Sequence, residues 1–379
     1  MSRRLLLLFS LSLSLGGGFV AATPRARDLG VPFDGVPGPL NAITDVAGVE
    51  VGQTTLIRGA GKLEVGAGPV RTGVTVVLPR GRANQAPVFA GWFSLNGNGE
   101  MTGTAWIDEA GILDGPVALT NTHSVGVVRD AIIQWQVQHG RGAGGDAWSL
   151  PVVAETWDGW LNDINGFHVK PGHVFAAIDG AKGGPVDEGG VGGGTGMICH
   201  EFKGGIGTAS RLTRGRTVGV LVQANYGLRG QLRIAGVPVG KEIPEGAFRP
   251  EETGSIIVVI ATDAPLLPHQ LKRLARRASL ALGRMGSTSG NGSGDLFIAF
   301  STANAVPTGR GQTGTVQMLA DDDLSPVFTA VVDATEEAIV NALVAGETMT
   351  GRDDHVVLGL PHDRLQAVLK KYARLNDVR

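Results

Sequence analysis

The stretch that decides the fold of this 379-residue chain is Thr253-Gly254-Ser255 followed by Ile-Ile-Val-Val-Ile at 256–260. Five successive β-branched residues predict a fully buried strand. Gly254 has no side chain to obstruct a strained backbone, so the Ser255 hydroxyl is able to attack the Gly254 carbonyl. An N-to-O acyl shift and hydrolysis would free the Ser255 amine, which titrates near ~7.7–8.0 and can act as a base. A simple turn leading into a strand is the alternative interpretation.

The composition is that of a globular protein. The net charge is −2, from 33 basic and 35 acidic residues, which supplies no long-range field for nucleic acid or an anionic bilayer. We therefore expect no nucleic-acid partner. The 59 glycines are neither periodic nor of low complexity, and they are typical of tight turns between short strands.

The first 22 residues differ from the rest of the chain. Arg3-Arg4 precedes an apolar stretch from Leu5 to Leu15, and Val20-Ala21-Ala22 supplies small residues for cleavage. This pattern is typical of a secretory signal peptide, and glycines at 16–18 interrupt it before the ~20 apolar residues that a membrane anchor needs. We expect residues 1–22 to be removed and the protein to be exported, periplasmic or secreted, with no membrane attachment. The arginine pair is also compatible with a twin-arginine signal, which leaves the export route open.

Sulfur and imidazole side chains indicate neither a disulfide nor a metal site. Cys199 is the only cysteine, so no intramolecular disulfide can form, and we expect its thiol to be buried in a strand as ordinary packing. The eight histidines show no metal-ligand spacing. We expect no metal and no cofactor.

Short strands dominate the first half of the chain, for example at 73–78 and 87–92. Helices are predicted at 125–139, 270–283, 329–345 and 364–372, with Ser124 as the N-cap of the first and a basic, solvated face on the second. Strands from both halves with helices between them predict two sheets packed face to face and covered outside by helices, in one domain.

Six blocks of sequence resemble, in the same order, the family of DmpA (L-aminopeptidase D-amidase/D-esterase) and BapA (β-peptidyl aminopeptidases). The blocks are Asn121–Gly126, Ala154–Thr156, Gly192–Met197, Phe202–Gly207, Gln223–Gly227, and Gly254–Leu266 with the Ser289–Asp295 stretch that follows it. The resemblance implies an α+β fold, the four-layer αββα sandwich that is related to ornithine acetyltransferase. It also implies self-cleavage before the nucleophilic serine, here Ser255, into pieces 23–254 and 255–379 of a single catalytic domain. A homo-oligomer, a tetramer or larger, is a further expectation from the family.

The resemblance assigns three more residues to catalysis. Ser293 and Asp295 correspond to a serine and an acidic residue that form a hydroxyl relay to the nucleophile, whereas a hairpin loop with an Asx turn is the local alternative. Asn225 stands where a buried strand ends, and its amide could donate to a developing oxyanion. Asn-Tyr-Gly is equally a turn signal.

Two residues are candidates for substrate binding. Glu155 is a lone acid among apolar residues, and a buried carboxylate is expensive without a cationic partner. The partner is either the free amino group of a substrate or an internal arginine such as Arg141. Trp157 stands where the family commonly has tyrosine, and an indole can neither accept a hydrogen bond nor ionise, so we expect an altered substrate preference.

These observations predict a self-processing serine aminopeptidase that removes the N-terminal residue from short peptides, amides or esters through an acyl-enzyme on Ser255. The preference among L-, D- and β-amino-acid N-termini is left open by the sequence. One alternative is an acyltransferase of the ornithine acetyltransferase type, although those enzymes use threonine as the nucleophile. Another is a nucleotide-binding module with Gly189–Gly196 as a phosphate cradle, a weak signal because no lysine follows.

Overall fold

A computed structural model describes residues 23–140, 148–307 and 310–377. The expected signal peptide, residues 1–22, lies outside the described residues. Two large sheets dominate the molecule. In spatial order the four-stranded sheet contains β1 (Glu50–Arg58), β2 (Val70–Leu78), β5 (Val117–Asn121) and β6 (Val152–Thr156). The six-stranded sheet contains β4 (Ile112–Leu113), β3 (Val88–Gly97), β12 (Gly294–Ser301), β11 (Ser255–Thr262), β10 (Arg216–Asn225) and β9 (Gly205–Thr213).

Two small ribbons and seven α-helices complete the described part of the chain. The ribbons pair β7 (Ile198–Cys199) with β8 (Phe202–Lys203) and β13 (Met349–Thr350) with β14 (Val356–Val357). The helices are α1 (Thr104–Ala110), α2 (Val125–Gln138), α3 (Pro171–Asp179), α4 (Val239–Glu242), α5 (Pro268–Arg284), α6 (Leu324–Val344) and α7 (His362–Lys371). Within the described residues, no helix combines the length and apolar character needed to cross a bilayer.

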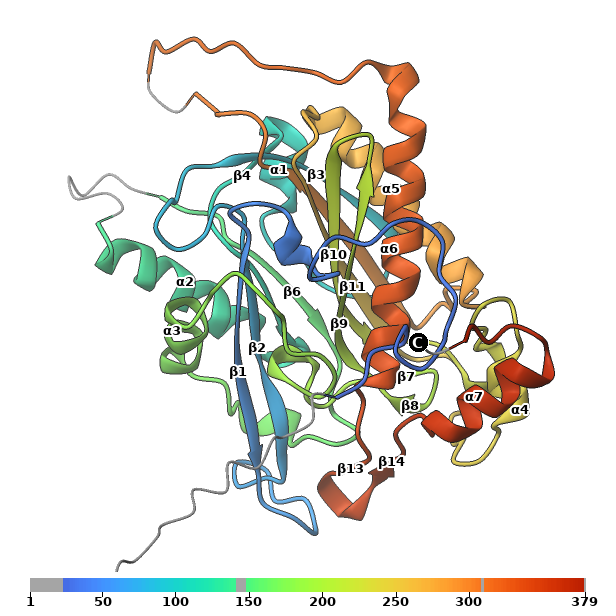
Figure 1. The fold of residues 1–379 in the computed structure, drawn as a ribbon. Helices are drawn as coiled ribbons and strands as arrows, with labels where there is room; N and C mark the ends of the chain where they lie inside the picture. The colour runs from blue at the N-terminus through green and yellow to red at the C-terminus, as the bar shows by residue number, and fades with distance from the viewer. Residues whose placement is uncertain (1–22, 141–147, 308–309, 378–379) are drawn as a thin grey trace, which may run out of the picture.

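The elements form four layers, which confirms the predicted αββα sandwich (Figure 1). One apolar cluster lies between α2, α3 and the four-stranded sheet. A second lies between the two sheets, and a third lies between the six-stranded sheet and the helices α5 and α6. Each sheet is therefore covered on both faces, which is why its strands read as continuous apolar runs rather than as alternating ones.

Strand β11 contains the predicted strand 256–260, and all of its residues are buried. Ile256 and Val258 belong to the cluster under the helices, whereas Ile257 and Val259 belong to the cluster between the sheets. The β-branched run thus supplies apolar side chains to two cores at once, because successive residues of a strand point to opposite faces.

The predicted helices match α2, α5, α6 and α7, with ends that differ by a few residues. The prediction that Ser124 caps α2 is wrong, because its side chain makes no capping hydrogen bond. A 3₁₀ turn, Thr122–Ser124, runs directly into the helix. Ser124 consequently has φ −102° and ψ 0° instead of the extended conformation from which a capping hydroxyl reaches the first helical amides.

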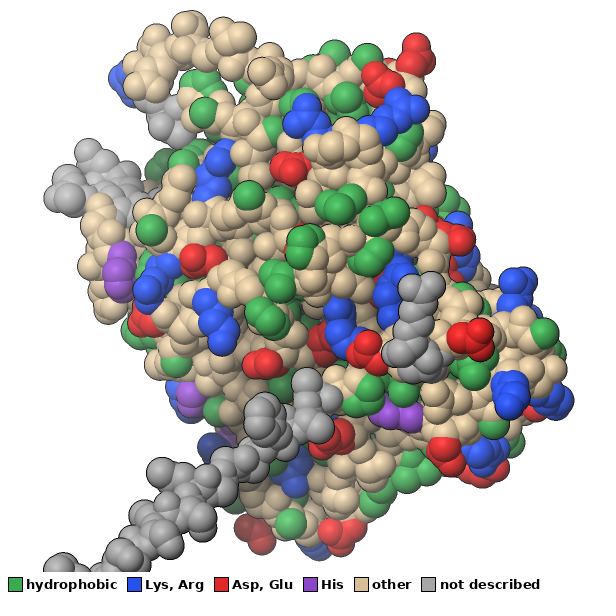
Figure 2. Space-filling model, in the orientation of Figure 1, with side chains coloured by type: hydrophobic (Ala, Val, Ile, Leu, Met, Phe, Trp, Pro, Cys, Tyr) green, Lys and Arg blue, Asp and Glu red, His purple; other side chains and the backbone are tan. Residues whose placement is uncertain are grey.

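The basic side chains of α5 contact acidic and aromatic side chains in addition to facing solvent. Lys272 and Arg273 pair with Asp108 and Asp321, each at 2.9 Å. The Arg277 guanidinium lies 3.9 Å from the centre of the Phe328 ring, where the ring attracts a cation. On the face shown in Figure 2, basic and acidic side chains are interspersed instead of gathering into one patch.

The glycine run at 189–196 lies between the sheets. Gly192–Gly194 forms a buried 3₁₀ turn. A β-carbon at Gly193 would stand 2.2 Å from Gln223 Oε1, and one at Gly194 would stand 2.4 Å from the Ile206 nitrogen. The glycines therefore allow close packing inside the sandwich, and the space that a phosphate would need is filled by neighbouring strands.

Candidate functional site

The ends of three neighbouring strands bring the predicted catalytic residues together. Ser255 is the first residue of β11. It pairs with Asn225, the last residue of antiparallel β10, and with Gly294, the first residue of parallel β12. Segments that are far apart in sequence thus meet at one edge of the six-stranded sheet.

One backbone amide contacts both groups that self-cleavage would involve, the serine hydroxyl and the carbonyl before it. The Gly294 N–H donates to Ser255 Oγ at 3.1 Å and to the Gly254 carbonyl oxygen at 3.2 Å. Ser255 is only 5% exposed. A β-carbon at position 254 would lie 2.1 Å from the Asn225 carbonyl oxygen, so only glycine fits immediately before the serine.

Ser293 and Asp295 form a buried hydrogen-bonded pair. Ser293 Oγ donates to Asp295 Oδ1 at 2.6 Å. Burial raises the pKa of Asp295, although the hydrogen bond from Ser293 acts in the opposite direction. Gly294 and Asp295 belong to β12, whereas Ser293 precedes the strand and donates its amide to the Gly290 carbonyl in a turn at 2.9 Å. Among the described residues no hydrogen bond joins Ser293 directly to Ser255, and Gly294 provides the contact between the pair and Ser255.

Asn225 is fully buried at the end of β10. Its Oδ1 accepts a hydrogen bond from the Ile198 amide at 2.7 Å, and its Nδ2 donates to the Trp157 carbonyl at 2.9 Å. A side-chain amide carries two N–H donors. The Trp157 carbonyl therefore fixes the orientation of the amide group and uses one of its two donors.

Glu155 lies on β6 of the other sheet and is 3% exposed. Its Oε1 accepts a hydrogen bond from the Glu100 amide at 3.0 Å, and its Oε2 accepts one from the Thr122 hydroxyl. Burial raises the pKa of Glu155, and these two hydrogen bonds oppose the rise. No lysine or arginine of the described residues forms an ion pair with this carboxylate. The alternative partner, Arg141, lies outside the described residues.

Glu155 and Ser255 line the same hollow, although they come from different sheets. The hollow has a volume of about 330 Å³, and its lining consists of Asn98, Thr122, Glu155, Trp157, Thr253, Gly254, Ser255 and Gly292. Trp157 is 41% exposed and forms an apolar wall. The arrangement places a nucleophilic hydroxyl and an anion in one cavity, which suits a substrate that carries a free amine beside its reacting carbonyl.

The sequence patterns predict no role for Thr122 or for the backbone of Gly294. Thr122 stands in the block Asn121–Gly126, so the resemblance contained a signal for it. The Gly294 amide had no such signal, because a backbone donor becomes recognisable only when the strand register is known.

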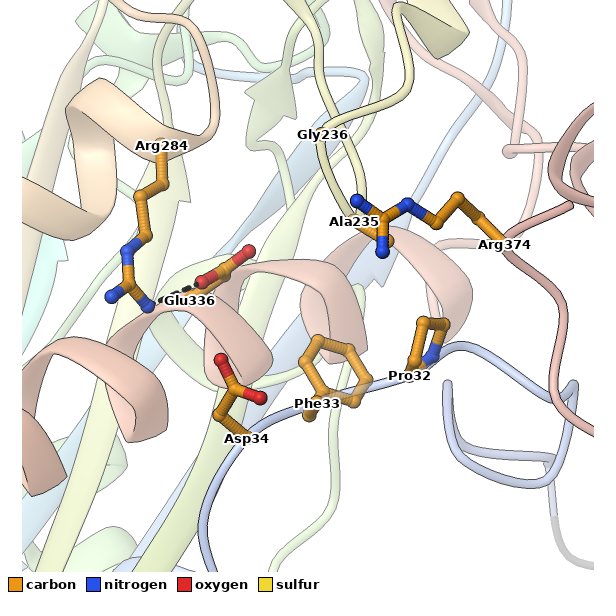
Figure 3. A pocket seen from close by; sticks show the side chains of 8 residues that line it. All are labelled: Pro32, Phe33, Asp34, Ala235, Gly236, Arg284, Glu336 and Arg374. Atoms are coloured by element: carbon orange, nitrogen blue, oxygen red, sulfur yellow. Dashed lines mark hydrogen bonds and ion pairs between the residues drawn. The ribbon is translucent and has the colours of Figure 1, made fainter. Parts of the chain in front are cut away.

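A second hollow, of about 350 Å³, lies elsewhere and is shown in Figure 3. The carboxylates of Asp34 and Glu336 lie on one side of it, and Glu336 pairs with Arg284 at 3.1 Å. Arg374 lies across the hollow, beyond Phe33. Its lining residues include no hydroxyl or thiol side chain, so it offers no nucleophile for acyl transfer.

The buried Cys199 thiol does not provide a competing nucleophile. Burial raises the pKa of Cys199 to about 12, so its thiol stays protonated at neutral pH. Burial lowers the pKa of His200 to about 4. Among the described residues no group of three or more His, Cys, Asp or Glu side chains is arranged to hold a metal ion.

Comparison with known proteins shows the family to which the chain belongs. The model of peptidase family S58 matches residues 41–357. The beta-peptidyl aminopeptidase BapA of Sphingosinicella microcystinivorans is 57% identical over 382 residues, which cover 95% of this chain and 96% of that protein. A Burkholderia beta-aminopeptidase structure is 52% identical with a TM-score of 0.85, covering 92% of this chain and 99% of that one.

A third relative connects the fold to a class of enzymes. The L-aminopeptidase D-Ala-esterase/amidase of Ochrobactrum anthropi is described as a prototype of the serine aminopeptidases and a variant of the Ntn hydrolase fold. Its structure has a TM-score of 0.88 and 51% identity, covering 93% of this chain and 99% of that one. These relatives do not favour the acyltransferase alternative. The chain therefore belongs to peptidase family S58 and is a hydrolase, an aminopeptidase of the Ntn-hydrolase fold.

Proposed function

We propose that this aminopeptidase is made as a precursor, cleaves its own Gly254–Ser255 bond and uses Ser255 as the catalytic nucleophile. The observation that carries the proposal is the Gly294 amide, which donates both to Ser255 Oγ and to the Gly254 carbonyl oxygen. A donor at that oxygen polarises the carbonyl, and the attacking hydroxyl is held beside it.

Self-cleavage then follows from the chemistry of a serine beside an activated carbonyl. The Ser255 Oγ–C bond forms, the Gly254 C–N bond breaks, and the hydroxyl proton passes to the departing nitrogen. Water hydrolyses the resulting ester, which leaves a Gly254 carboxylate and restores the Ser255 hydroxyl. The amine that is released titrates near ~7.7–8.0, so a fraction of it is neutral and able to accept a proton at physiological pH.

In the cleaved enzyme, the same residues would catalyse acyl transfer from a substrate. The Ser255 amine takes the hydroxyl proton as Oγ attacks the substrate carbonyl, and it returns the proton to the leaving amine. The Gly294 amide and the second Asn225 N–H are the donors for the oxyanion, where the loss of one donor typically costs ~10²–10³ in turnover. The Ser293–Asp295 pair supplies a hydroxyl and a carboxylate to the proton transfers.

Glu155 would select substrates with a free N-terminal amine. Its buried carboxylate faces the hollow that contains Ser255, and a substrate ammonium would give it a cationic partner. Among such substrates, we propose peptides with an N-terminal β-amino acid. Two curated relatives at 57% and 52% identity are named beta-peptidyl aminopeptidases. Trp157, in place of the tyrosine that the family commonly has, forms one wall of the hollow and is proposed to influence this preference.

The decisive experiment combines electrophoresis, intact-mass analysis and amidase assays on the purified protein. We expect two pieces, with Ser255 at the N-terminus of the smaller one. Ser255→Ala should give the unsplit precursor and no measurable turnover, because both reactions need the same hydroxyl. A Ser255→Ala protein with normal hydrolysis would place the nucleophile elsewhere.

The substrate class is tested with matched amides that have L-, D- and β-amino-acid N-termini, each with its N-acetylated counterpart. We expect the highest kcat/KM for the β-amino-acid amide and no cleavage of any acetylated one.

Export is also proposed, because residues 1–22 have the pattern of a signal peptide. An exported product that begins after Ala22 would support it. The oligomeric state stays a prediction.

A further inference from the structure

The turn that joins β7 to β8 has an unusual backbone. His200 and Glu201 both have positive φ, 48° and 60°. Two consecutive residues of this kind form the tight turn that normally selects glycine or asparagine, and bulkier side chains adopt it only when their surroundings hold them there. Both residues are buried. The contacts of Glu201 show what the turn positions.

Glu201 uses its carboxylate to bind backbone amides. It is 2% exposed. Its Oε2 accepts a hydrogen bond from the Arg229 amide at 2.7 Å, and its Oε1 accepts two more, from the amides of Phe248 at 2.5 Å and Arg249 at 2.6 Å. Two of the three donors therefore belong to the segment that leads to the proposed cleavage site.

The side chain of Arg229 binds backbone carbonyl groups of the same segment. Its side chain is 2% exposed, and it donates to four backbone carbonyls, those of His200 at 3.0 Å, Glu201 at 2.7 Å, Ile243 at 3.0 Å and Glu245 at 2.6 Å. Its guanidinium lies 3.2 Å from the centre of the Phe202 ring. Burial lowers its pKa to about 10, so the group remains charged at neutral pH.

The two charged groups together hold residues 243–249. Arg229 binds the carbonyls at 243 and 245, and Glu201 binds the amides at 248 and 249. Among the described residues, Glu201 and Arg229 do not form a direct side-chain ion pair. Burying a charge is expensive unless hydrogen bonds compensate it, and here the compensation comes largely from the backbone of this segment.

Only residues 250–254 separate this anchor from the Gly254–Ser255 bond. Five residues reach at most about 17 Å when fully extended, so an anchor at Arg249 restricts where the Gly254 carbonyl can lie. Within those five residues, Glu252 accepts weaker hydrogen bonds from Gln231 at 3.2 Å and Ser287 at 3.1 Å.

We propose that Glu201 and Arg229 are positioning residues for self-cleavage, which we call the linker clamp. The proposal rests on the self-processing function proposed above. Before the cut, the linker clamp keeps the Gly254 carbonyl at the Gly294 amide. After the cut, it keeps residues 243–249, near the new C-terminus of the first piece, bound to the rest of that piece. Before the cut, Thr253 and Gly254 line the hollow. After the cut, residues 250–254 are free to leave it.

The test compares the rate of self-cleavage in three full-length proteins made by cell-free translation: the wild type, Glu201→Gln and Glu337→Gln. Glu337 is the matched control because its carboxylate is equally buried, at 1% exposure, and pairs with Arg211 and Arg27 away from the linker. Electrophoresis and intact mass follow the pieces over time. We expect Glu201→Gln to slow cleavage by about tenfold or more, which corresponds to about 1.4 kcal/mol of activation free energy, and Glu337→Gln to cut at nearly the wild-type rate.

The second readout separates positioning from general stability. Turnover per free N-terminal serine should be the same in the cut fraction of Glu201→Gln as in the wild type, because the linker clamp does not touch substrate. Arg229→Lys, which keeps the charge but loses the forked donor geometry, should show the same pattern. The proposed role of the linker clamp would be wrong if both clamp variants were cleaved at the wild-type rate, or if Glu337→Gln were slowed as much as Glu201→Gln. Neither result would contradict self-processing. A wild type that stays whole would overturn the self-processing function itself.

Discussion

Glu155 is 3% exposed. Its carboxylate accepts hydrogen bonds from a threonine hydroxyl and from a backbone amide. Burial raises its pKa, because desolvation disfavours the charged form. A substrate ammonium would reverse this effect by bringing the opposite charge into the hollow. Ionisation of Glu155 and binding of a free amine therefore favour each other.

We predict that Glu155→Gln lowers kcat/KM for substrates with a free amine by about 10²-fold or more, since removing one partner of a buried charge pair is strongly destabilising, by about 3–5 kcal/mol. In the wild type, protonation of Glu155 should reduce kcat/KM as the pH falls. Because the pKa is raised, the reduction should begin at a higher pH than the ordinary glutamate pKa of about 4.3 would give. The measurement is kcat/KM as a function of pH.

Glu100→Gln is the control for this prediction. The backbone amide of Glu100 binds Glu155 and is unchanged by the substitution, whereas the negative charge of the Glu100 side chain helps to raise the pKa of Glu155. Glu100→Gln should therefore keep an acid limb and move it to lower pH. If Glu155→Gln retained the same acid limb as the wild type, another group would control it, and the proposed role of Glu155 would be wrong.

At the level of single residues, side chains were more predictable than backbone groups. Ser255, Asn225 and Glu155 stand in recognisable blocks, and the structure places them around one hollow or directly beside it. The Gly294 amide was not predictable, since its position depends on the parallel register of β11 and β12. That register is a long-range property that local sequence does not encode.

At the level of elements, close contact between helices and the six-stranded sheet depends on glycine. A β-carbon at Gly207 of β9 would lie 1.9 Å from the Ala338 carbonyl oxygen of α6, and one at Gly91 of β3 would lie 2.4 Å from the Lys272 nitrogen of α5. In both places the obstructing atom belongs to the helix backbone. Neither helix can accommodate a side chain there without moving as a whole.

We predict that Gly207→Ala lowers the free energy of unfolding by about 3 kcal/mol, near the upper end of the usual range for overpacking. Gly126→Ala is the matched control, because a β-carbon at this position of α2 meets no atom within 4 Å, and alanine in a helix is favoured over glycine by about 0.5–1 kcal/mol. Both changes are measured by urea unfolding in the Ser255→Ala protein, which should be a single chain. Equal stability of the two variants would mean that α6 adjusts freely over β9.

The elements themselves were predicted best where one local pattern dominates. The β-branched run at 256–260 became β11 because both faces of that strand are covered. The cap of α2 was predicted wrongly because a preceding 3₁₀ turn changes the conformation of Ser124. The turn at His200 and Glu201 gave no glycine or asparagine signal, since its stability comes from contacts with Arg229 and the linker.

At the level of the whole molecule, the order of the strands determines what a cut before Ser255 would do. Strands β11 and β12 follow the cut, and they lie side by side between β10 and β3, which precede it. The pairing of β10 with β11 runs from Asn225 and Ser255 to Val218 and Thr262. This order could not be read from the sequence, which predicted two sheets but not which strands are neighbours.

We predict that the two pieces of the cut enzyme stay together as one folded unit. Separating them would break two strand pairings, β10 with β11 and β12 with β3, and would expose the apolar clusters to which both pieces contribute. Unpaired buried backbone groups carry a large penalty. In native gel filtration both pieces should elute in one peak, at the volume of uncut Ser255→Ala, and activity should survive extensive dilution. Separation should require denaturant at a concentration that also unfolds the protein. Pieces that elute apart in native buffer would show that strand pairing across the cut does not hold the enzyme together.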